Sequence, residues 1–91
     1  MSRVGQIRKR DANEPQIVKA LRKLGAQVIR ISEKGAPDLL VLWRGDLFVM
    51  EVKSRLGRTT LAQDATIDGG WPVFLVRSVE DALRAIMQEK P

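Results

Sequence analysis

The stretch from Pro37 to Ser54, PDLLVLWRGDLFVMEVKS, constrains the fold of this chain more than any other segment. Two apolar runs flank Arg44-Gly45, a pattern that predicts two strands joined by a tight turn. Because both alternating sets of side chains in each run are largely apolar, we expect both faces of the resulting sheet to be covered. Asp38 near one end, and Glu51 and Lys53 near the other, interrupt the apolar pattern. Burying ionised groups costs free energy, so their presence on these strands requires a reason.

The register of this hairpin predicts that the two carboxylates meet. A turn at Arg44-Gly45 pairs Leu42 with Leu47 and, further along the same face, Asp38 with Glu51. Directly opposed side chains have β-carbons about 5 Å apart. Two carboxylates at that separation repel each other and lose hydration, and a divalent cation between them relieves both costs. Hard oxygen ligands suit Mg²⁺ or Mn²⁺, which can also activate water for attack on phosphorus.

Lys53 follows Glu51 by two residues and therefore shares its face of the strand. Its ammonium group could orient a nucleophilic water or stabilise the charge that develops on a phosphate. Taken one at a time, a Glu-x-Lys on a strand is usually a solvated charge pattern, and an aspartate after a proline usually marks a strand-entry turn. Together, on the same face and in a basic chain, Asp38, Glu51 and Lys53 favour a metal-dependent site for phosphodiester hydrolysis.

Helical and strand patterns flank the hairpin. We expect helices at about 13–24, 60–68 and 78–90, and strands at about 26–32 and 71–77, in addition to the hairpin strands at 37–43 and 46–54. Asp11 or Asn13 can cap the first helix, and Gly25 ends it. The almost entirely apolar run 71–77 predicts a central or parallel strand covered on both faces. The order α-β-β-β-α-β-α predicts one α/β domain with a mixed four-stranded sheet flanked by helices.

Glu14 lies at the start of the first predicted helix. It precedes Ile17 by three residues and Leu21 by seven, so its carboxylate shares the inward, apolar stripe of that helix. An acid at a helix N-terminus is also favourable for purely structural reasons. From the residues alone, this structural interpretation is the better supported of the two.

The composition restricts the classes of function. The chain has 91 residues with 16 Lys and Arg against 11 Asp and Glu, and its formal net charge of +5 favours nucleic acid as a partner. The absence of Cys and His excludes thiolate zinc sites, cysteine nucleophiles and histidine bases, and the absence of Tyr excludes tyrosine recombinases. No phosphate-cradling NTPase motif occurs, so we expect no nucleotide cofactor. Hydrolysis must therefore depend on carboxylates, lysine, hydroxyl groups and metal.

The length and the hydrophobic pattern bear on assembly and location. A domain of this length has a thin core, which makes homodimerisation a reasonable expectation. No apolar run approaches the roughly 20 residues that span a membrane, and the first residues lack the apolar segment of a signal peptide. We therefore expect no membrane partner and a cytoplasmic protein.

Basic residues outside the hairpin are candidates for contacts with DNA phosphates. Residues 1–10 form a basic arm ahead of a single domain over 11–91, and this arm reads equally well as a solvated tail. The loops on either side of the hairpin strands carry further basic residues. The candidate DNA-binding residues are Arg8, Lys9, Arg10, Lys34, Arg55 and Arg58. Such contacts read the shape of the backbone and not the base sequence.

An ordered set of motifs resembles a known nuclease family. Gly35-Ala36-Pro37-Asp38 followed by Glu51-Val52-Lys53 is similar to the signature of the PD-(D/E)XK nuclease superfamily. With Glu14 before them and Thr60-Leu61-Ala62-Gln63 after them, these motifs resemble the virus-type replication–repair nuclease (VRR-NUC) domain over about residues 11–87. The resemblance implies the restriction-endonuclease-like α-β-β-β-α-β core.

The resemblance also implies roles for individual residues. Asp38 and Glu51 would be metal ligands together with the backbone carbonyl of Val52, and Lys53 would be the catalytic lysine. Glu14 and Gln63 would be supporting active-site residues, with Glu14 reaching the metal directly or through a water molecule. Thr60-x-x-Gln63 is in addition a helix capping box, which offers a structural interpretation of Gln63.

The similar stand-alone modules are associated with phages and bacteria and resemble junction-resolving enzymes, which act as homodimers. We therefore predict an endodeoxyribonuclease that depends on Mg²⁺ or Mn²⁺ and selects branched DNA such as four-way junctions or flaps. We expect it to act as a homodimer in the cytoplasm of a bacterium or a phage-infected host cell. The alternatives are a non-catalytic or partner-dependent DNA-binding module with the same fold, and a sequence-specific restriction-type enzyme, for which the length leaves little room.

Overall fold

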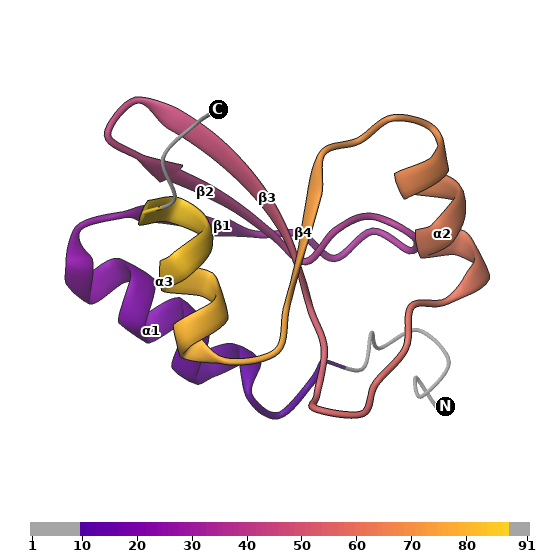
Figure 1. Ribbon diagram of the computed structural model, residues 1–91, viewed down its shortest axis with the longest axis horizontal. Helices are drawn as coiled ribbons and strands as arrows, with labels where there is room; N and C mark the ends of the chain where they lie inside the picture. Colours follow the sequence, from indigo (N-terminus) through magenta and orange to yellow (C-terminus); the bar gives the residue numbers. More distant parts are fainter. Residues whose placement is uncertain (1–9, 88–91) are drawn as a thin grey trace, which may run out of the picture.

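A mixed four-stranded sheet in the order β1-β2-β3-β4 forms the centre of the computed structural model, which describes residues 10–87 (Figure 1). The elements in chain order are α1 (Glu14–Leu24), β1 (Gln27–Arg30), β2 (Leu39–Trp43), β3 (Asp46–Val52), α2 (Leu61–Asp68), β4 (Val73–Val76) and α3 (Val79–Met87). This arrangement confirms the predicted α/β fold class and element order. The last residues of the third expected helix lie outside the described part of the chain, as do residues 1–9 of the basic arm. Within residues 10–87, no helix is long and apolar enough to cross a membrane.

The hairpin between β2 and β3 has the predicted turn and register. Arg44 (φ 52°) and Gly45 (φ 83°) both adopt left-handed conformations, as a two-residue type I′ turn requires. Leu42 faces Leu47, and the pairing continues without a slip as far as Leu39 and Met50. A left-handed Arg44 is unfavourable for a residue with a β-carbon, but its guanidinium lies 4.7 Å from the centre of the Trp43 ring. This stacking offsets part of the conformational cost.

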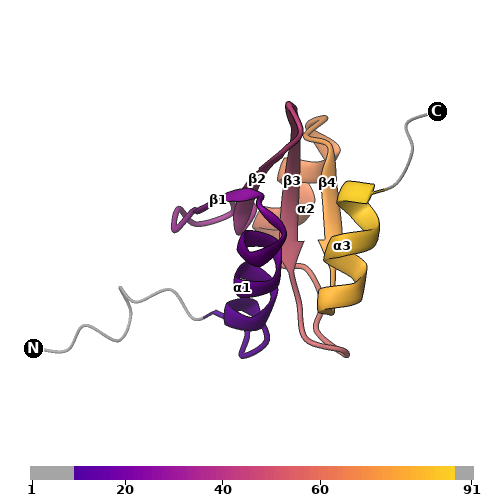
Figure 2. The same cartoon turned by 90° about the vertical axis from the view of Figure 1, so that its left-hand side faces the viewer.

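The hydrophobic core lies between one face of the sheet and the two helices α1 and α3, which cover that face side by side (Figure 2). The inward stripe of α1 contributes Ile17 and Leu21, and alternate residues of β2 and β3 contribute Leu39, Met50 and Val52, all of them fully buried. Helix α1 ends as predicted, because Gly25 is left-handed (φ 109°) and its amide bonds back to carbonyls of the last turn.

The opposite face of the sheet is largely open, and the expectation that both faces are covered was wrong. Ile29, Leu42 and Leu47 are 63%, 42% and 62% exposed, although their strands are apolar on both sides. The helix on this side, α2, has only eight residues and bonds to the face at Glu51, through Gln63. β4 is an edge strand parallel to β3, not a central strand, and its Leu75 is 43% exposed. An apolar pattern predicts that a face avoids water, but it does not predict what covers that face.

The topology brings four chain segments together at one end of the sheet. β2 and β3 are antiparallel, so the start of β2 lies beside the end of β3. The amide of Lys53, just beyond β3, donates to the carbonyl of Val76 at the end of β4. The side-chain amide of Asn13, ahead of α1, donates to the carbonyls of Lys53 (3.2 Å) and Arg77 (3.1 Å). The ends of the strands and the start of α1 are thereby fastened to one another.

Candidate active site

Three hydrogen bonds hold Asp38 at the open end of the hairpin, opposite the turn. Its amide donates to the carbonyl of Met50 (3.0 Å), and its carbonyl accepts from the amide of Ile31 (2.8 Å). Its Oδ2 accepts from the buried amide of Val52 at 2.7 Å. The regular ladder ends at Leu39, one residue before the predicted pairing of Asp38 with Glu51, and the Asp38 side chain bonds to β3 at this point. Asp38 is only 5% exposed, and these three hydrogen bonds fix its backbone and its carboxylate.

Glu51 lies beside Asp38 and is only 2% exposed. Its Oε2 accepts from Gln63 Nε2 at 2.6 Å and lies 3.4 Å from Lys53 Nζ. The pKa of Glu51 is raised to about 7, chiefly by burial and then by the neighbouring Asp38 carboxylate, while Lys53 acts in the opposite direction. Asp38 is close enough to Glu51 to affect its pKa, but the predicted cross-strand pair of the two residues is not formed, because the ladder stops at Leu39 and Met50 and the Asp38 amide bonds to Met50.

Gln63 both caps a helix and bonds to a carboxylate of the site. Its Oε1 accepts from the amide of Thr60 at 2.9 Å, and its own amide donates to Thr60 Oγ1 at 3.1 Å, which completes a capping box at the start of α2. The Nε2 of the same side chain donates to Glu51 Oε2. The capping box therefore holds the amide group in the orientation that reaches Glu51.

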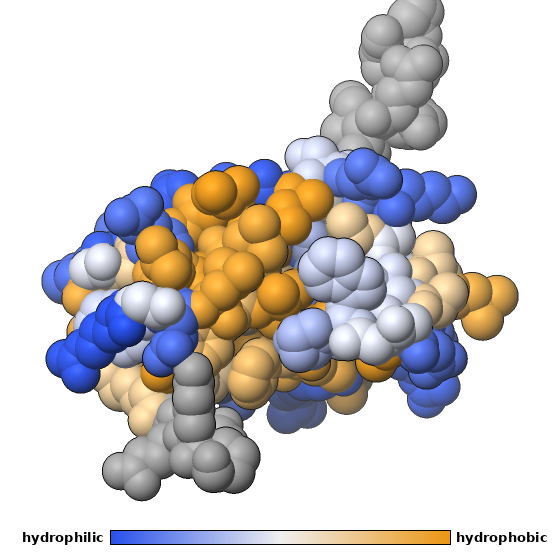
Figure 3. All heavy atoms as spheres, turned by 90° about the horizontal axis from the view of Figure 1, so that it is seen from above, coloured by the Kyte–Doolittle hydropathy of each residue, from blue (hydrophilic) through white to orange (hydrophobic). Residues whose placement is uncertain are grey.

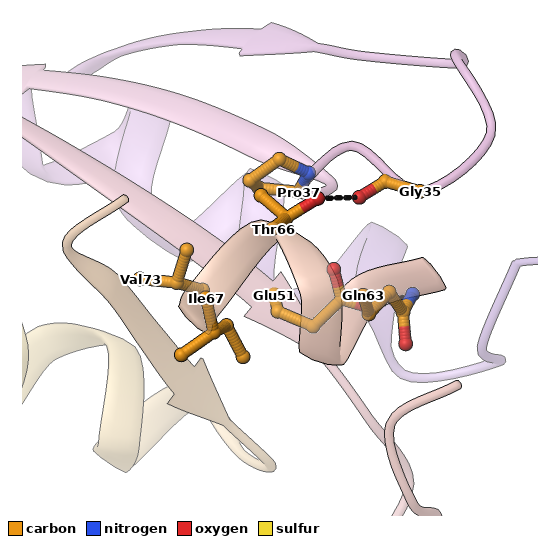
Figure 4. Close-up of a pocket in the computed structure, with 7 residues that line it drawn as sticks. All are labelled: Gly35, Pro37, Glu51, Gln63, Thr66, Ile67 and Val73. Atoms are coloured by element: carbon orange, nitrogen blue, oxygen red, sulfur yellow. Dashed lines mark hydrogen bonds between the residues drawn. The ribbon is translucent and has the colours of Figure 1, made fainter. Parts of the chain in front are cut away.

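The loop before Asp38 packs closely against α2. Thr66 Oγ1 donates to the carbonyl of Gly35 at 2.8 Å (Figure 4). Gly35 is left-handed (φ 81°), and a β-carbon added to it would lie 3.2 Å from the β-carbon of Ala62. A side chain at this position would therefore push the loop away from α2. The glycine of the Gly-Ala-Pro-Asp motif thus permits the contact that places Asp38 and Gln63 at one site.

Glu14 is fully buried at the start of α1, but its neighbours are arginines. Its Oε2 accepts from Arg10 Nη1 at 2.5 Å and from Arg30 Nε at 3.0 Å. Its Oε1 is buried without a hydrogen-bond partner among the described residues. Within residues 10–87, no three His, Cys, Asp or Glu side chains form a group that could hold a metal ion. Glu14 therefore lies beside the pair of Asp38 and Glu51 and does not join it as a third clustered carboxylate.

Three residues at this site were missed or misplaced by the sequence analysis. Arg10, assigned to the arm, pairs with Glu14 at the i,i+4 spacing of a helical ion pair, and this spacing was the available signal. Arg30 shares a strand face with the buried Val28, and a charge on a core-facing position indicates a buried partner of opposite sign. Asn13 makes no side-chain cap bond, and no local pattern indicates its contacts with the ends of β3 and β4.

The predicted DNA-binding residues that the structure describes lie on both sides of the site. Lys34 is exposed in the loop before Asp38, and Arg55 and Arg58 are exposed in the loop after Lys53. Arg77 organises the second loop, because its Nη1 donates to the carbonyls of Ser54 and Gly57, both at 2.7 Å. Arg8 and Lys9 lie outside the described residues.

The donor set of the site fits a hard divalent cation. Asp38 and Glu51 are both buried at the end of β3, and burial, followed by the repulsion of the Asp38 carboxylate, raises the pKa of Glu51. A cation bound there would offset both effects, and Mg²⁺ and Mn²⁺ prefer such oxygen ligands. The buried, unpartnered Oε1 of Glu14 is a further oxygen acceptor near the same end of the sheet.

The raised pKa of Glu51 predicts how the stability of the metal-free protein depends on pH. The folded protein holds this proton up to about pH 7, whereas the unfolded chain releases it near 4.5. The folded state binds more protons between these values, so the contribution of Glu51 to the free energy of unfolding falls as the pH rises. We expect urea unfolding in EDTA to show that the free energy of unfolding of Glu51→Gln, relative to that of wild type, increases by on the order of 2 kcal/mol from about pH 5 to pH 8. A difference that stays constant with pH would contradict this assignment.

Comparisons with known proteins agree with this architecture. The family model described as archaeal Holliday junction resolvase (Hjc) matches residues 6–83 of the chain. Among solved structures, a VRR_NUC domain is similar to it with a TM-score of 0.66 and 28% sequence identity, over 88% of this chain and 100% of the other. No curated protein matches the chain. The resemblance to the VRR-NUC domain inferred from the motifs is confirmed.

Proposed function

The chain belongs to the family of archaeal Holliday junction resolvases, and from this premise we propose that it is a structure-selective endonuclease that depends on a divalent metal and hydrolyses phosphodiester bonds in branched DNA. The observation that carries the proposal is that Asp38 and Glu51 are both buried at the end of β3, where Asp38 Oδ2 accepts from the Val52 amide and Lys53 Nζ lies 3.4 Å from Glu51 Oε2. A buried carboxylate pair beside an ammonium group has little structural value unless it binds something. We propose that it acts in the cytoplasm of a bacterium or a phage-infected host cell, as the resemblance to stand-alone modules implied.

Each residue of the site has a distinct role in this proposal. Asp38, Glu51 and the backbone carbonyl of Val52 would hold Mg²⁺ or Mn²⁺. The bound cation would supply a Lewis acid and an activated water. Lys53 places a compact positive charge next to this position, where it stabilises the negative charge that develops on the phosphate. Gln63 fixes the orientation of the Glu51 carboxylate through their 2.6 Å hydrogen bond.

DNA would approach along the exposed basic loops. Lys34, Arg55 and Arg58 can contact phosphates on either side of the scissile bond, and Arg8 and Lys9 of the arm can extend this contact. Phosphate contacts carry no base information, which is compatible with selection of DNA by its shape. Aromatic residues make up 4% of the chain, so stacking of bases is a minor part of binding.

Cleavage assays with three matched substrates test the function. A labelled four-way junction, a flap and a linear duplex of the same sequence are incubated with Mg²⁺, with Mn²⁺ or with EDTA. We expect cleavage of a branched substrate with either metal and none with EDTA. Equal cleavage of all three substrates would remove the structure selectivity. Salt-sensitive DNA binding without cleavage under any condition would support the alternative, a non-catalytic or partner-dependent module of the same fold.

We further propose that the protein acts as a homodimer, so that two sites can make paired cuts. The open sheet face supports this proposal. Ile29, Leu42, Leu47 and Leu75 project from it on neighbouring strands, and Trp71 (58% exposed) borders it. Figure 3 shows the broad hydrophobic area that gathers on this side of the molecule. Exposed apolar patches of this kind mark interaction sites, and such a patch can pack against the same patch of a second copy.

A charge placed on this face should dissociate the dimer. Leu47→Asp puts a carboxylate on the proposed interface, where pairing with a second copy would bury it without a partner. We expect light scattering to report a dimer for wild type and a monomer for Leu47→Asp. Leu56→Asp is the matched control, because Leu56 is 81% exposed but lies in the loop after β3. A wild-type monomer, or a Leu47→Asp dimer of unchanged affinity, would contradict this interface.

A further inference from the structure

The guanidinium group of Arg10 lies between two of the acidic residues at the site. Its Nη1 donates to Glu14 Oε2 at 2.5 Å and lies 3.9 Å from Asp38 Oδ1. Its Nη2 donates to the carbonyl of Ile31 and to Ser32 Oγ, both of which follow β1. The side chain is 19% exposed. Arg10 therefore connects the start of α1, the end of β1 and the carboxylate of Asp38.

These contacts distinguish Arg10 from the other arginines that the structure describes. Arg30 also pairs with Glu14, but its side chain is 42% exposed, compared with 19% for Arg10. Arg55 and Arg58 are exposed in a loop. Arg10 forms ion pairs with two different carboxylates of the site, Glu14 and Asp38. Its positive charge is thus placed beside the oxygens that would receive a cation.

We propose that Arg10 is a positioning residue that holds Glu14 beside Asp38 and lowers the affinity of the site for a divalent cation. This inference rests on the proposed function, because it assumes that Asp38 is a metal ligand. A fixed positive charge within a few ångströms of Asp38 repels a second cation. The same charge compensates the buried carboxylate of Glu14, which would otherwise lie near the carboxylate of Asp38 without Arg10 between them. The affinity of the site for a divalent cation therefore depends on how strongly the Arg10 charge repels that cation.

Removal of the Arg10 charge should tighten cation binding. Arg10→Gln keeps a polar side chain with a hydrogen-bond donor, but the repulsion acting on a cation at Asp38 is gone. We expect the dissociation constant for Mn²⁺, measured by titration calorimetry on the DNA-free protein, to fall about tenfold. The melting temperature without metal should fall as well, and the increase caused by Mn²⁺ should exceed that of wild type.

Two further variants separate charge from shape. Arg10→Lys keeps the charge and loses the planar fork, so its Mn²⁺ affinity should stay within about threefold of wild type. Arg22→Gln is the matched control, because Arg22 lies on α1 and donates to the carbonyl of Val28 without contact to the site carboxylates. If Arg10→Gln does not fold, Arg10→Met carries the same measurement as a second neutral variant.

The outcomes distinguish this inference from the proposed function. Mn²⁺ that binds wild type but binds Arg10→Gln equally or more weakly would overturn the role of Arg10 and leave the metal site intact. An equal shift in Arg10→Gln and Arg10→Lys would also overturn it, because charge would then not be the cause. Absence of Mn²⁺ binding in wild type would overturn the metal site itself, and the role of Arg10 with it.

Discussion

Lys53→Met is expected to lower the rate of DNA cleavage by about 10³-fold while leaving the fold and DNA binding largely unchanged. The backbone of Lys53 is held independently of its side chain, by Val76 through its amide and by Asn13 through its carbonyl. Methionine fills a similar volume, so truncation creates no large cavity at a side chain that is 12% exposed. The loss would therefore report the ammonium group and not the stability of β3.

A pH series separates two roles of this lysine. Lys53 opposes the rise in the pKa of Glu51, so its removal should leave Glu51 more protonated near neutral pH. If Lys53 acted only through Glu51, cleavage by Lys53→Met would recover at about pH 9, where Glu51 is ionised in either case. We expect no such recovery, because the charge next to the phosphate is still missing. Lys19→Met, on the exposed side of α1, is the control and should cut at the wild-type rate.

Asp38→Asn is expected to reduce cleavage by about 10³-fold and to weaken Mn²⁺ binding strongly, because the site loses one of its two anionic ligands. The asparagine carbonyl can still accept the hydrogen bond from the Val52 amide that Asp38 Oδ2 accepts at 2.7 Å. The fold should therefore persist. The pKa of Glu51 should fall from about 7, since the adjacent negative charge that raises it is gone.

Asp38→Ala and Asp68→Asn complete this experiment. Asp38→Ala leaves the Val52 amide buried without an acceptor, which costs about 1–3 kcal/mol of stability that Asp38→Asn retains. Asp68→Asn removes an exposed carboxylate at the end of α2 and should change neither cleavage nor Mn²⁺ binding. Wild-type cleavage and Mn²⁺ affinity in Asp38→Asn would eliminate Asp38 as a metal ligand.

The hairpin and its carboxylates could be predicted from the sequence because the information is local. Strand side chains alternate with period two, and a two-residue turn at Arg44-Gly45 leaves one register in which the apolar sets match. That register runs from Leu42 and Leu47 to Leu39 and Met50 as predicted. The capping box at Gln63 is local in the same way, since its partners are three residues apart. The identity of the family followed from the same short motifs.

The surroundings of Glu14 could not be predicted in this way. Arg10 and Arg30 reach Glu14 from before α1 and from the far end of β1, and Arg30 is sixteen residues away in the chain. Whether a buried acid faces a metal site or a guanidinium depends on how α1 packs against the sheet. The pairing of Asp38 with the Val52 amide, beyond the regular ladder, depends on the same packing.

The amino-acid pattern was sufficient to establish the order of helices and strands, the hairpin register and the meeting of Asp38 with Glu51, because each depends on residues linked by a short turn. The three-dimensional packing was needed to show that one sheet face stays open, that Gln63 both caps α2 and binds Glu51, and that Arg10 sits beside Asp38. These features depend on contacts between elements distant in the chain, whose geometry no local periodicity encodes.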